Sequence, residues 1–530
     1  MSSRSEDGEG CRSDMATNTR NRALMERQAQ KALVSERYVP ATMLRLLSTV
    51  DLTTLLLLNV FWITNVTPMI ALGGLAAFSY WILCGFLFFV PCSLMMAQLG
   101  MMFPHEGSFF SWTYHALGPG WDFFVGVCIW LPGMLSLMNA AGVIVSSIQA
   151  LNDKVLVLSW QQGAVILIVL MAVGALSTRR TQIIFLVLRV ATGGMLLATG
   201  LIVGAALVWL LSGHHSATNF ADLAGWAIVV QGPQSNLGLL GNGVLAFLGS
   251  NMALGMAGEI RPQREKAIIR RHLVWGTVII MMSYLALTFA LLAVEGAAAN
   301  VSNPIVLAIA TVDRVFGTVG GNIVAICIQF YFFAIVVALN VCYGRLFMVA
   351  AIDRRVSVRF AQLNSQRVPA YAMWTQIIIV IGVTIILYGV APLVAVFGDP
   401  ANFSSAVYNI ISASVLLVWA VAFLFPFIDV AVLYLRDRRA FNRQRVAPLP
   451  VLAFSVCSGI VLCVGAIVTT LVNSFIPQLM PNNVWSYVVG GLTLICLILC
   501  GIGSMLTNSE AQWEDLRAQE EDVSERKGSI

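Results

Sequence analysis

Residues 59–68 read Asn-Val-Phe-Trp-Ile-Thr-Asn-Val-Thr-Pro and lie within an apolar stretch, residues 52–71, that is long enough to cross a membrane as a helix. Pro68 has no amide proton, and its ring crowds the carbonyl group four residues earlier. Unpaired backbone is tolerated inside a membrane only where it lines a cavity or is buried in protein. This stretch therefore predicts an interrupted helix next to a binding cavity.

A second apolar stretch, residues 239–258, has a similar small and polar centre. Residues 247–255 read Phe-Leu-Gly-Ser-Asn-Met-Ala-Leu-Gly, and the two stretches are five spans apart in a chain whose first ten spans divide five plus five. Paired interruptions of this kind point to the binding site of a transporter. Freed amides and a half-helix N-terminus attract a carboxylate, while freed carbonyls accept from an ammonium group, so the pattern favours a zwitterionic substrate.

The composition of the whole chain agrees with a membrane protein. Its 530 residues are 58% hydrophobic and 11% charged, whereas soluble chains are about 45 to 50% apolar and about 25% charged. We expect an all-α membrane protein with twelve transmembrane helices. The expected spans are residues 52–71, 75–101, 121–150, 155–176, 183–211, 239–258, 273–293, 318–351, 370–389, 403–435, 451–472 and 485–506.

These spans divide the chain into a transporter domain and two tails. The expected regions are a polar cytoplasmic N-terminal tail (1–45), the transporter domain (46–507) with a first repeat (about 46–211), a second repeat (about 239–435) and two further helices (about 451–507), and a charged cytoplasmic C-terminal tail (508–530).

The basic residues predict the orientation of the chain. Cytoplasmic loops carry an excess of Lys and Arg, and with both termini inside, all but four of the 31 Lys and Arg residues are cytoplasmic. Lys154 and Arg314 fall outside, and Arg189 and Arg345 lie within spans. We expect a multi-pass protein of the cell membrane whose partners are the lipid bilayer and a small molecule, with no nucleic acid.

Signatures of enzymes and of resident cofactors do not occur in the sequence. The five histidines lie in loops or at span ends, the ten cysteines form no Cys-x-x-Cys pair, and no lysine follows a glycine as a phosphate-binding loop requires. We therefore expect no enzyme activity, no metal site and no cofactor.

Residues 89–126 resemble the second span, the first cytoplasmic loop and the start of the third span of the amino acid-polyamine-organocation (APC) permeases. The match includes Pro104-His-Glu-Gly107 and Leu117-Gly-Pro-Gly-Trp121, and residues 257–262 and 344–353 support it. The nearest pattern is the glutamate/GABA antiporter branch. The resemblance covers residues 45–500 and implies a leucine-transporter-type five-plus-five inverted repeat with broken helices 1 and 6, and alternating access for an amino acid or related amine.

Carried over position by position, the resemblance implies where the substrate binds. Many members have a glycine-rich first break and an acidic residue at the position of Asn251, so the side chain of the substrate is not predicted. The implied substrate-binding residues are Thr64, Asn65, Val66 and Thr67 in the first span and Gly249, Ser250 and Asn251 in the sixth.

Arg189 is the ionisable side chain well inside the fifth span, and such residues are functional by default. The resemblance places it where some proton-coupled members carry a lysine near the sodium site of sodium-coupled relatives, which implies a role in ion coupling, with protons as the coupling ion. The alternative is that Arg189 reaches the cytoplasmic surface, since it lies about 12 Å from Thr181 by helix rise. Arg345 is expected to anchor the end of the eighth span.

Two further sets of residues are candidates for gates. Glu106 and Glu259 either close the cytoplasmic side or pair neighbouring loops. The aromatic candidates, each of which could equally be a packing residue, are Phe247, Trp130, Tyr331 and Tyr408.

Two functions remain open. The first is a secondary transporter, an exchanger or a proton-linked carrier; its central spans have no acidic residue, which favours neutral or acidic amino acids over polyamines. The second is a receptor or membrane scaffold subunit of transporter fold that binds without moving its ligand.

Overall fold

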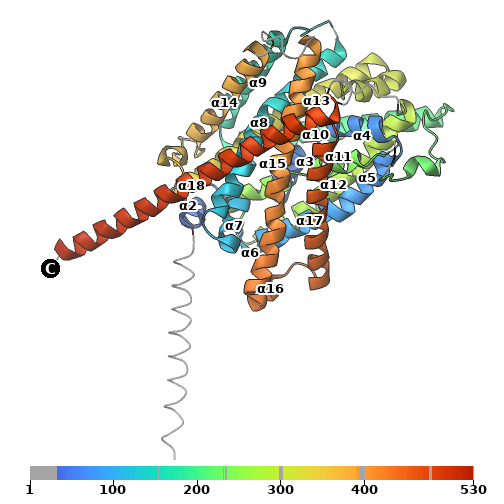
Figure 1. Ribbon diagram of the computed structural model, residues 1–530. Coiled ribbons are helices and arrows are strands. Elements are labelled where there is room, and N and C mark those ends of the chain that lie inside the picture. The colour runs from blue at the N-terminus through green and yellow to red at the C-terminus, as the bar shows by residue number, and fades with distance from the viewer. Residues whose placement is uncertain are drawn as a thin grey trace, which may run out of the picture.

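The computed structural model describes residues 33–152, 154–230, 232, 235–297, 303–390, 392, 400–476 and 480–528, with the backbone alone for 400–408 and 508–528. Within these residues the regular structure is helical, and a single isolated bridge joins Leu47 to Ile260. Figure 1 shows a bundle of long helices with α18 extending beyond it.

The helices follow one another in this order: α2 (Val34–Thr42), α3 (Thr49–Val60), η1 (Ile63–Asn65), α4 (Val66–Gly73), α5 (Ala76–Cys84), the π-turn η2 (Gly85–Phe89), α6 (Val90–Met102), α7 (Phe109–Leu117), α8 (Trp121–Leu151), α9 (Ser159–Ser177), α10 (Thr181–Leu211), η3 (Leu223–Trp226), α11 (Gly238–Leu245), η4 (Met252–Glu259), α12 (Glu265–Val294), α13 (Val306–Ile352), η5 (Val358–Ala361), α14 (Ala370–Ile385), the π-turn η6 (Ile386–Val390), α15 (Pro400–Arg436), α16 (Arg438–Gln444), α17 (Leu449–Val472) and α18 (Asn482–Gly528).

Eleven of the twelve expected spans are confirmed as single helical stretches. Eleven helical stretches among the described residues are long and apolar enough to cross a membrane. The twelfth is α11 followed by η4, which is interrupted and therefore too short in either half to count alone. The first span, Thr49–Gly73, is also built from two helices, α3 and α4.

Two span ends differ from the expectation. The helix α13 begins at Val306, earlier than the expected start at 318, because a short helix precedes a bend at Gly317, whose φ of 73° is not helical. The helix α18 continues as backbone helix to Gly528, through most of the expected C-terminal tail.

The start of the first span follows from local hydrogen bonds. The Ser48 hydroxyl accepts from the Asp51 amide and donates to the Asp51 carboxylate, which also accepts from the Ser48 amide. This reciprocal arrangement is a capping box, and it pairs amides that the first helical turn leaves free. The helix α3 therefore begins at Thr49.

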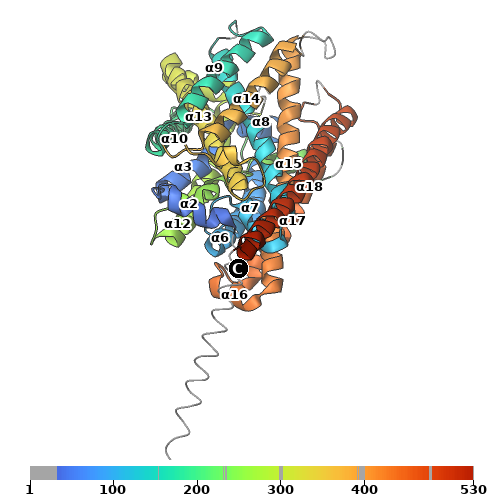
Figure 2. The ribbon, with the colours of Figure 1, turned by 90° about the vertical axis from the view of Figure 1, so that its left-hand side faces the viewer.

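The broken helices lie inside the bundle and the last two spans lie outside it. About 72% of the residues in the hydrophobic window of the first span are buried, against 28% for α17 and 22% for α18. Both α17 and α18 contact α15, and Figures 1 and 2 show α18 crossing the bundle obliquely on its outside. The outer helices present apolar side chains to the lipid and leave the interior to the two breaks.

Candidate functional site

The first break lies at Phe61 and Trp62. The helix α3 ends at Val60, and Phe61 (φ −87°, ψ 90°) and Trp62 (φ −109°, ψ 112°) have extended backbone before the chain turns helical again at Ile63. Pro68 is the third residue of α4, which directly continues η1. The proline therefore lies inside the second half-helix, which begins at Ile63, and the interruption lies several residues before it.

The second break lies between α11 and η4 and contacts the first. Gly249 has a φ of 103°, a conformation that favours glycine. A β-carbon on Gly249 would lie 3.0 Å from the carbonyl oxygen of Asn59. The backbones of the two interrupted spans thus meet directly, and residue 249 has to be a glycine for both conformational and steric reasons.

Two tyrosine hydroxyls complete the hydrogen bonding of the first break. Tyr284 of α12 donates to the Val60 carbonyl at 2.7 Å and accepts from the Trp62 amide at 3.1 Å. Tyr331 of α13 lies 2.9 Å from the Leu57 carbonyl and 3.0 Å from the Phe61 carbonyl. The backbone groups released by the break are therefore paired by phenols from two other spans.

The sequence predicted Tyr331 as a gate candidate but did not single out Tyr284. A signal for Tyr284 was present, because it is a phenol in the middle of an apolar span, and a buried polar group needs a partner. What the sequence did not contain was the identity of that partner, more than 200 residues earlier in the chain.

The four candidate residues of the first span point in different directions. The Asn65 side chain donates to the Tyr284 hydroxyl at 3.2 Å, so it faces the break. The Thr67 hydroxyl donates to the Pro304 carbonyl at 2.7 Å, in the segment that leads into α13. Thr64 and Val66 are buried.

The candidates of the sixth span are buried next to the first span. The Ser250 hydroxyl lies 3.3 Å from the Cys92 sulfur, and Asn251 is 2% exposed at the start of η4. Together with Gly249 they place small and polar groups opposite the end of α3.

Phe247 and Tyr331 belong to an aromatic layer around the breaks. Phe247 stacks on Phe89 at 4.7 Å between ring centroids and meets Tyr284 edge-on at 5.6 Å. Tyr331 packs against Phe61 at 6.5 Å.

Trp130 lies away from the two breaks. The Trp130 ring stacks on Phe347, and its indole donates to Gln376 at 3.1 Å. The side chain of Tyr408 lies outside the described residues.

One end of the bundle carries α2, the loop of residues 103–108, the end of η4 and the end of α13, and we call it the α2 face. Segment 43–47 joins it: the Leu47 amide donates to the Glu259 carbonyl at 3.0 Å, and the Arg261 amide donates to the Leu47 carbonyl at 3.2 Å. Val39 and Met43 are buried against neighbouring helices. Residues 33–47 thus pack across the α2 face.

Glu106, Glu259 and Arg345 form a buried cluster just inside the α2 face. The Arg345 Nε donates to the Glu259 carboxylate and lies 3.9 Å from the Glu106 carboxylate. Glu106 accepts from the Gly258 amide at 2.9 Å. Burial, followed by the charge of Glu259, raises the pKa of Glu106 well above its usual value, against the opposing effect of Arg345. The two carboxylates from distant loops are therefore brought together, and Arg345 is their common partner.

Arg189 pairs with Asp51 in the first turn of α3. Asp51 precedes Phe61 by ten residues, which is about 15 Å of helix, so Arg189 lies towards the α2 face. Its side chain is 46% exposed. This position fits the alternative in which the side chain reaches the membrane surface, and its role in ion coupling stays a prediction.

The residues that the structure describes contain no group of three or more His, Cys, Asp or Glu side chains arranged to hold a metal ion.

The fold and the paired breaks define a class of protein, a membrane transporter of the leucine-transporter type. The solved structure of a mutant of the manganese transporter of Eremococcus coleocola matches with a TM-score of 0.55 over 88% of this chain and 95% of that one, at 14% identity. The same transporter in complex with an aromatic bis-isothiourea compound matches with a TM-score of 0.54 at 15% identity and the same coverage. At this identity the similarity shows the fold alone.

Residues 47–497 match the family model described as amino acid permease, and the chain belongs to that family. The resemblance to the APC permeases is thereby confirmed. The model describes the family at large, so the glutamate/GABA antiporter branch stays a prediction.

Individual relatives match over short stretches. A probable polyamine transporter of Arabidopsis thaliana is 35% identical over 68 residues, which are 13% of this chain and 12% of that protein. The inner membrane transporter YjeM of Escherichia coli strain K12 is 30% identical over 93 residues, 17% of this chain and 18% of the relative. The chain thus matches less than a fifth of the length of these relatives, and they support a multi-pass membrane transporter.

Proposed function

We propose that this protein is a secondary transporter that carries amino acids or related amines across the cell membrane by alternating access, as an exchanger or with protons as the coupling ion. The observation that carries the proposal is the direct contact of the two breaks, with Gly249 against Asn59. Two half-helices that meet in mid-bundle supply backbone groups to a small ligand and can also separate as the bundle rocks.

The proposed site for the substrate head comprises Thr64, Asn65, Val66, Thr67, Gly249, Ser250 and Asn251. In the first break the carbonyls of Leu57, Val60 and Phe61 already interact with tyrosine hydroxyls. A substrate ammonium group would have to compete with these phenols or use carbonyls of the sixth span. The Thr67 contact with Pro304 suits a role in holding the α4 half-helix more than direct binding.

The residues around the breaks favour an amino acid over a polyamine. No carboxylate lies among the described residues of either break, 59–68 and 246–252, and a polyamine would need one to balance its charge. The relatives named as polyamine transporters match only about an eighth of their own length. We therefore propose a neutral or acidic amino acid as the substrate.

We propose gates on either side of this site. Phe247 and Tyr331 would close the aromatic layer, whereas Glu106 and Glu259 would close the α2 face through Arg345. Trp130 and Tyr408 remain weaker candidates for a gate.

The test is uptake of labelled amino acids into liposomes that contain the purified full-length protein. We expect uptake of at least one amino acid, and about a fivefold loss in Thr64→Val and Asn251→Leu, since a lost hydrogen bond costs about 1 kcal/mol and a tenfold change is about 1.4 kcal/mol. The matched control is Thr375→Val on the exposed side of α14, which should transport normally.

Full uptake in both site variants would place the substrate elsewhere. Thermal stabilisation by an amino acid, with no flux under gradients of either sign, would contradict transport and favour a receptor or scaffold subunit of transporter fold.

A further inference from the structure

The cluster on the α2 face contains two carboxylates and one guanidinium. The guanidinium makes a direct hydrogen bond to only one of these two carboxylates. Glu106 comes from the loop before α7, Glu259 from the end of η4 and Arg345 from α13, and all three side chains are at most 2% exposed. Glu259 takes the direct hydrogen bond from Arg345 Nε. Among the described side chains, Glu106 Oε1 has no hydrogen-bond partner, and neither have the two terminal nitrogens of Arg345.

Within the part of the chain that the structure describes, Glu259 and Arg345 are the charged groups that act on Glu106. Cys342 of α13 is the further titratable group that faces the cluster. Arg45 donates to the Gly258 carbonyl at 3.2 Å rather than to a carboxylate. On α2, Glu36 is engaged with His115, His105 and Ser111, and Val39 presents a methyl group to Gly258.

With both carboxylates ionised, the buried cluster would carry one uncompensated negative charge. An uncompensated buried charge costs several kcal/mol, and proteins avoid it by binding a proton. A proton on Glu106 leaves the neutral Arg345–Glu259 pair beside a neutral acid. The closed arrangement of this face is therefore compatible with a protonated Glu106, and water can stabilise the ionised form only where the elements separate.

The three elements of the cluster are also the ones that opening would separate. The helix η4 follows the sixth break directly, and α13 carries Tyr331, which bonds to the first break. Movement at the breaks would thus be transmitted to Glu259 and Arg345, and the charge state of Glu106 would bias that movement.

We infer that Glu106 is a proton-binding site whose proton is bound when the α2 face closes and released to water when that face opens, with Arg345 and Glu259 as its fixed ion pair. The inference rests on the proposed transport function and assigns the coupling proton to this cluster rather than to Arg189. The proton adds to a Glu106 carboxylate oxygen on closing and leaves from it on opening, with no other bond changed.

The first experiment is exchange of a labelled amino acid in proteoliposomes as a function of pH on both sides. We expect the rate of the unaltered protein to rise with pH, and Glu106→Gln to lose this dependence and stay at the low rate, because the amide imitates the protonated acid. Glu259→Gln should move the profile to lower pH, because Glu106 is then the counter-ion of Arg345. Glu295→Gln, which alters the Arg314 pair at the other end of the bundle, is the matched control and should keep the profile.

An unchanged pH profile in Glu106→Gln would overturn the inference. So would an unshifted profile in Glu259→Gln, since the two carboxylates would then not share Arg345.

A second measurement separates this inference from the transport proposal, because it needs no substrate. The pKa of Glu106 is raised in the folded protein, so the folded state keeps its proton at pH values where the unfolded chain has lost it. Stability then falls as the pH rises from about 4.3, the pKa of an unperturbed glutamate, through the folded pKa. We expect the melting temperature of the detergent-solubilised protein to fall over this range more steeply than that of Glu106→Gln.

Parallel melting curves for the two proteins would overturn the proton site whether or not any amino acid is transported. Curves that diverge with pH, without transport of any amino acid, would contradict only the transport function.

Discussion

At the scale of single residues, the first break depends on Tyr284. Its hydroxyl is fully buried and touches the Val60 carbonyl, the Trp62 amide and the Asn65 side chain. Because the break leaves these backbone groups without helical partners, one hydroxyl holds the extended turn at Phe61 and Trp62. Gly249 plays the complementary part in the sixth span, where it allows the two backbones to touch.

Tyr284→Phe should destabilise the protein and slow transport. The change keeps the ring but leaves a buried amide and a buried carbonyl without this partner, at a cost of about 1 to 3 kcal/mol. We expect a lower melting temperature in detergent and reduced amino acid uptake. The control is Tyr487→Phe on α18, which is 82% exposed and should change neither quantity. A melting temperature equal to that of the unaltered protein would show that the hydroxyl does not hold the break.

The sequence predicted which spans are interrupted but not where. Pro68 and the polar run from Thr64 to Thr67 suggested an interruption at those residues, and the helix stops earlier, at Val60. The position of a break depends on which distant groups can pair the released backbone, and here they are Tyr284 and Tyr331. The sequence pattern predicts that the released backbone groups need hydrogen-bond partners, but it does not identify the residues that supply them.

At the scale of elements, α2 is the helix whose packing partners the sequence did not predict. Residues 1–45 read as a polar tail, and the part from residue 33 onward forms α2 and packs on the bundle. The Ser35 amide and hydroxyl both donate to the Asp353 carboxylate, at 2.9 and 2.7 Å. These contacts join residues more than 300 positions apart, so a short helix with few apolar residues gains its stability from partners that no local pattern identifies.

Glu36 is the main charged anchor of α2. It lies 2.6 Å from His115 Nε2 and accepts from Ser111 at 3.2 Å. Burial alone would raise the pKa of Glu36, but the hydrogen bond and charge of His115, with His105 and Ser111, outweigh it and hold the pKa below its usual value. The folded contact therefore favours the ionised carboxylate.

This depressed pKa predicts that acid releases α2. The contribution of Glu36 is fully present above its unfolded pKa of about 4.3 and is lost as the pH falls through the lower folded pKa. Glu36→Gln should remove it at pH 7, where a hydrogen bond to a charged group contributes about 1.5 to 3 kcal/mol. Hydrogen exchange of the backbone amides of residues 34–42 should then be about tenfold faster or more.

The control for this prediction is Tyr38→Phe, on the exposed side of the same helix, which should exchange at the normal rate. Equal exchange rates in Glu36→Gln and the unaltered protein would mean that the apolar contacts of Val39 and Met43 hold α2 without the ion pair.

At the scale of the whole molecule, the number of spans was predictable because twenty apolar residues in a row have few other uses. The sixth span was predicted together with the others, although its two halves, α11 and η4, are short and distorted. The meeting of Glu106 and Glu259 with Arg345 was not predictable, since the sequence suggested gating or loop pairing for the two carboxylates and an anchor of the eighth span for Arg345. Helix packing brings Glu106, Glu259 and Arg345 together. In this arrangement one arginine faces two carboxylates, so the cluster has less positive than negative charge.

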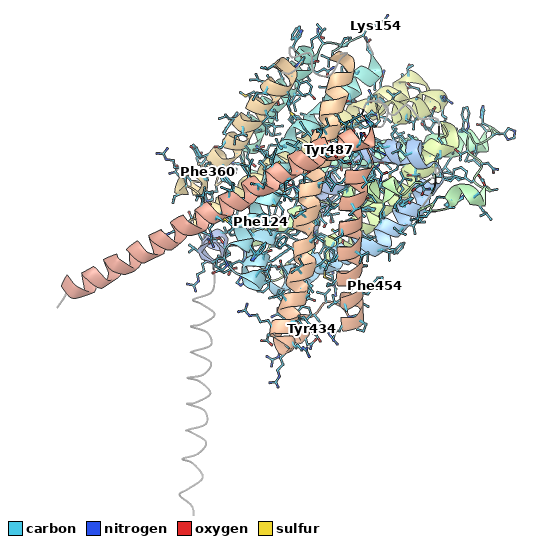
Figure 3. The ribbon with its side chains drawn as sticks, in the orientation of Figure 1. Phe124, Lys154, Phe360, Tyr434, Phe454 and Tyr487 are labelled. Atoms are coloured by element: carbon cyan, nitrogen blue, oxygen red, sulfur yellow. The ribbon has the colours of Figure 1, made fainter. Side chains whose placement is uncertain are left out.

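The orientation of the protein in the membrane determines which compartment would exchange a proton with Glu106. Figure 3 shows Lys154 at one end of the bundle and Tyr434 near the opposite end. The Tyr434 end belongs to the α2 face, because Arg436 donates to the His115 carbonyl at 3.4 Å, and His115 binds Glu36 of α2. The bias of basic residues predicts that this end is cytoplasmic.

A membrane-impermeant thiol reagent added to intact cells should therefore label Lys154→Cys and not Arg439→Cys, and the order should reverse in inside-out vesicles. The unaltered protein, with its native cysteines, provides the background. Labelling of Arg439→Cys from outside would show that the protein has the opposite orientation in the membrane. It would also make the external medium the source of the Glu106 proton, because the cluster opens on the same face as α16 whichever way the protein is inserted.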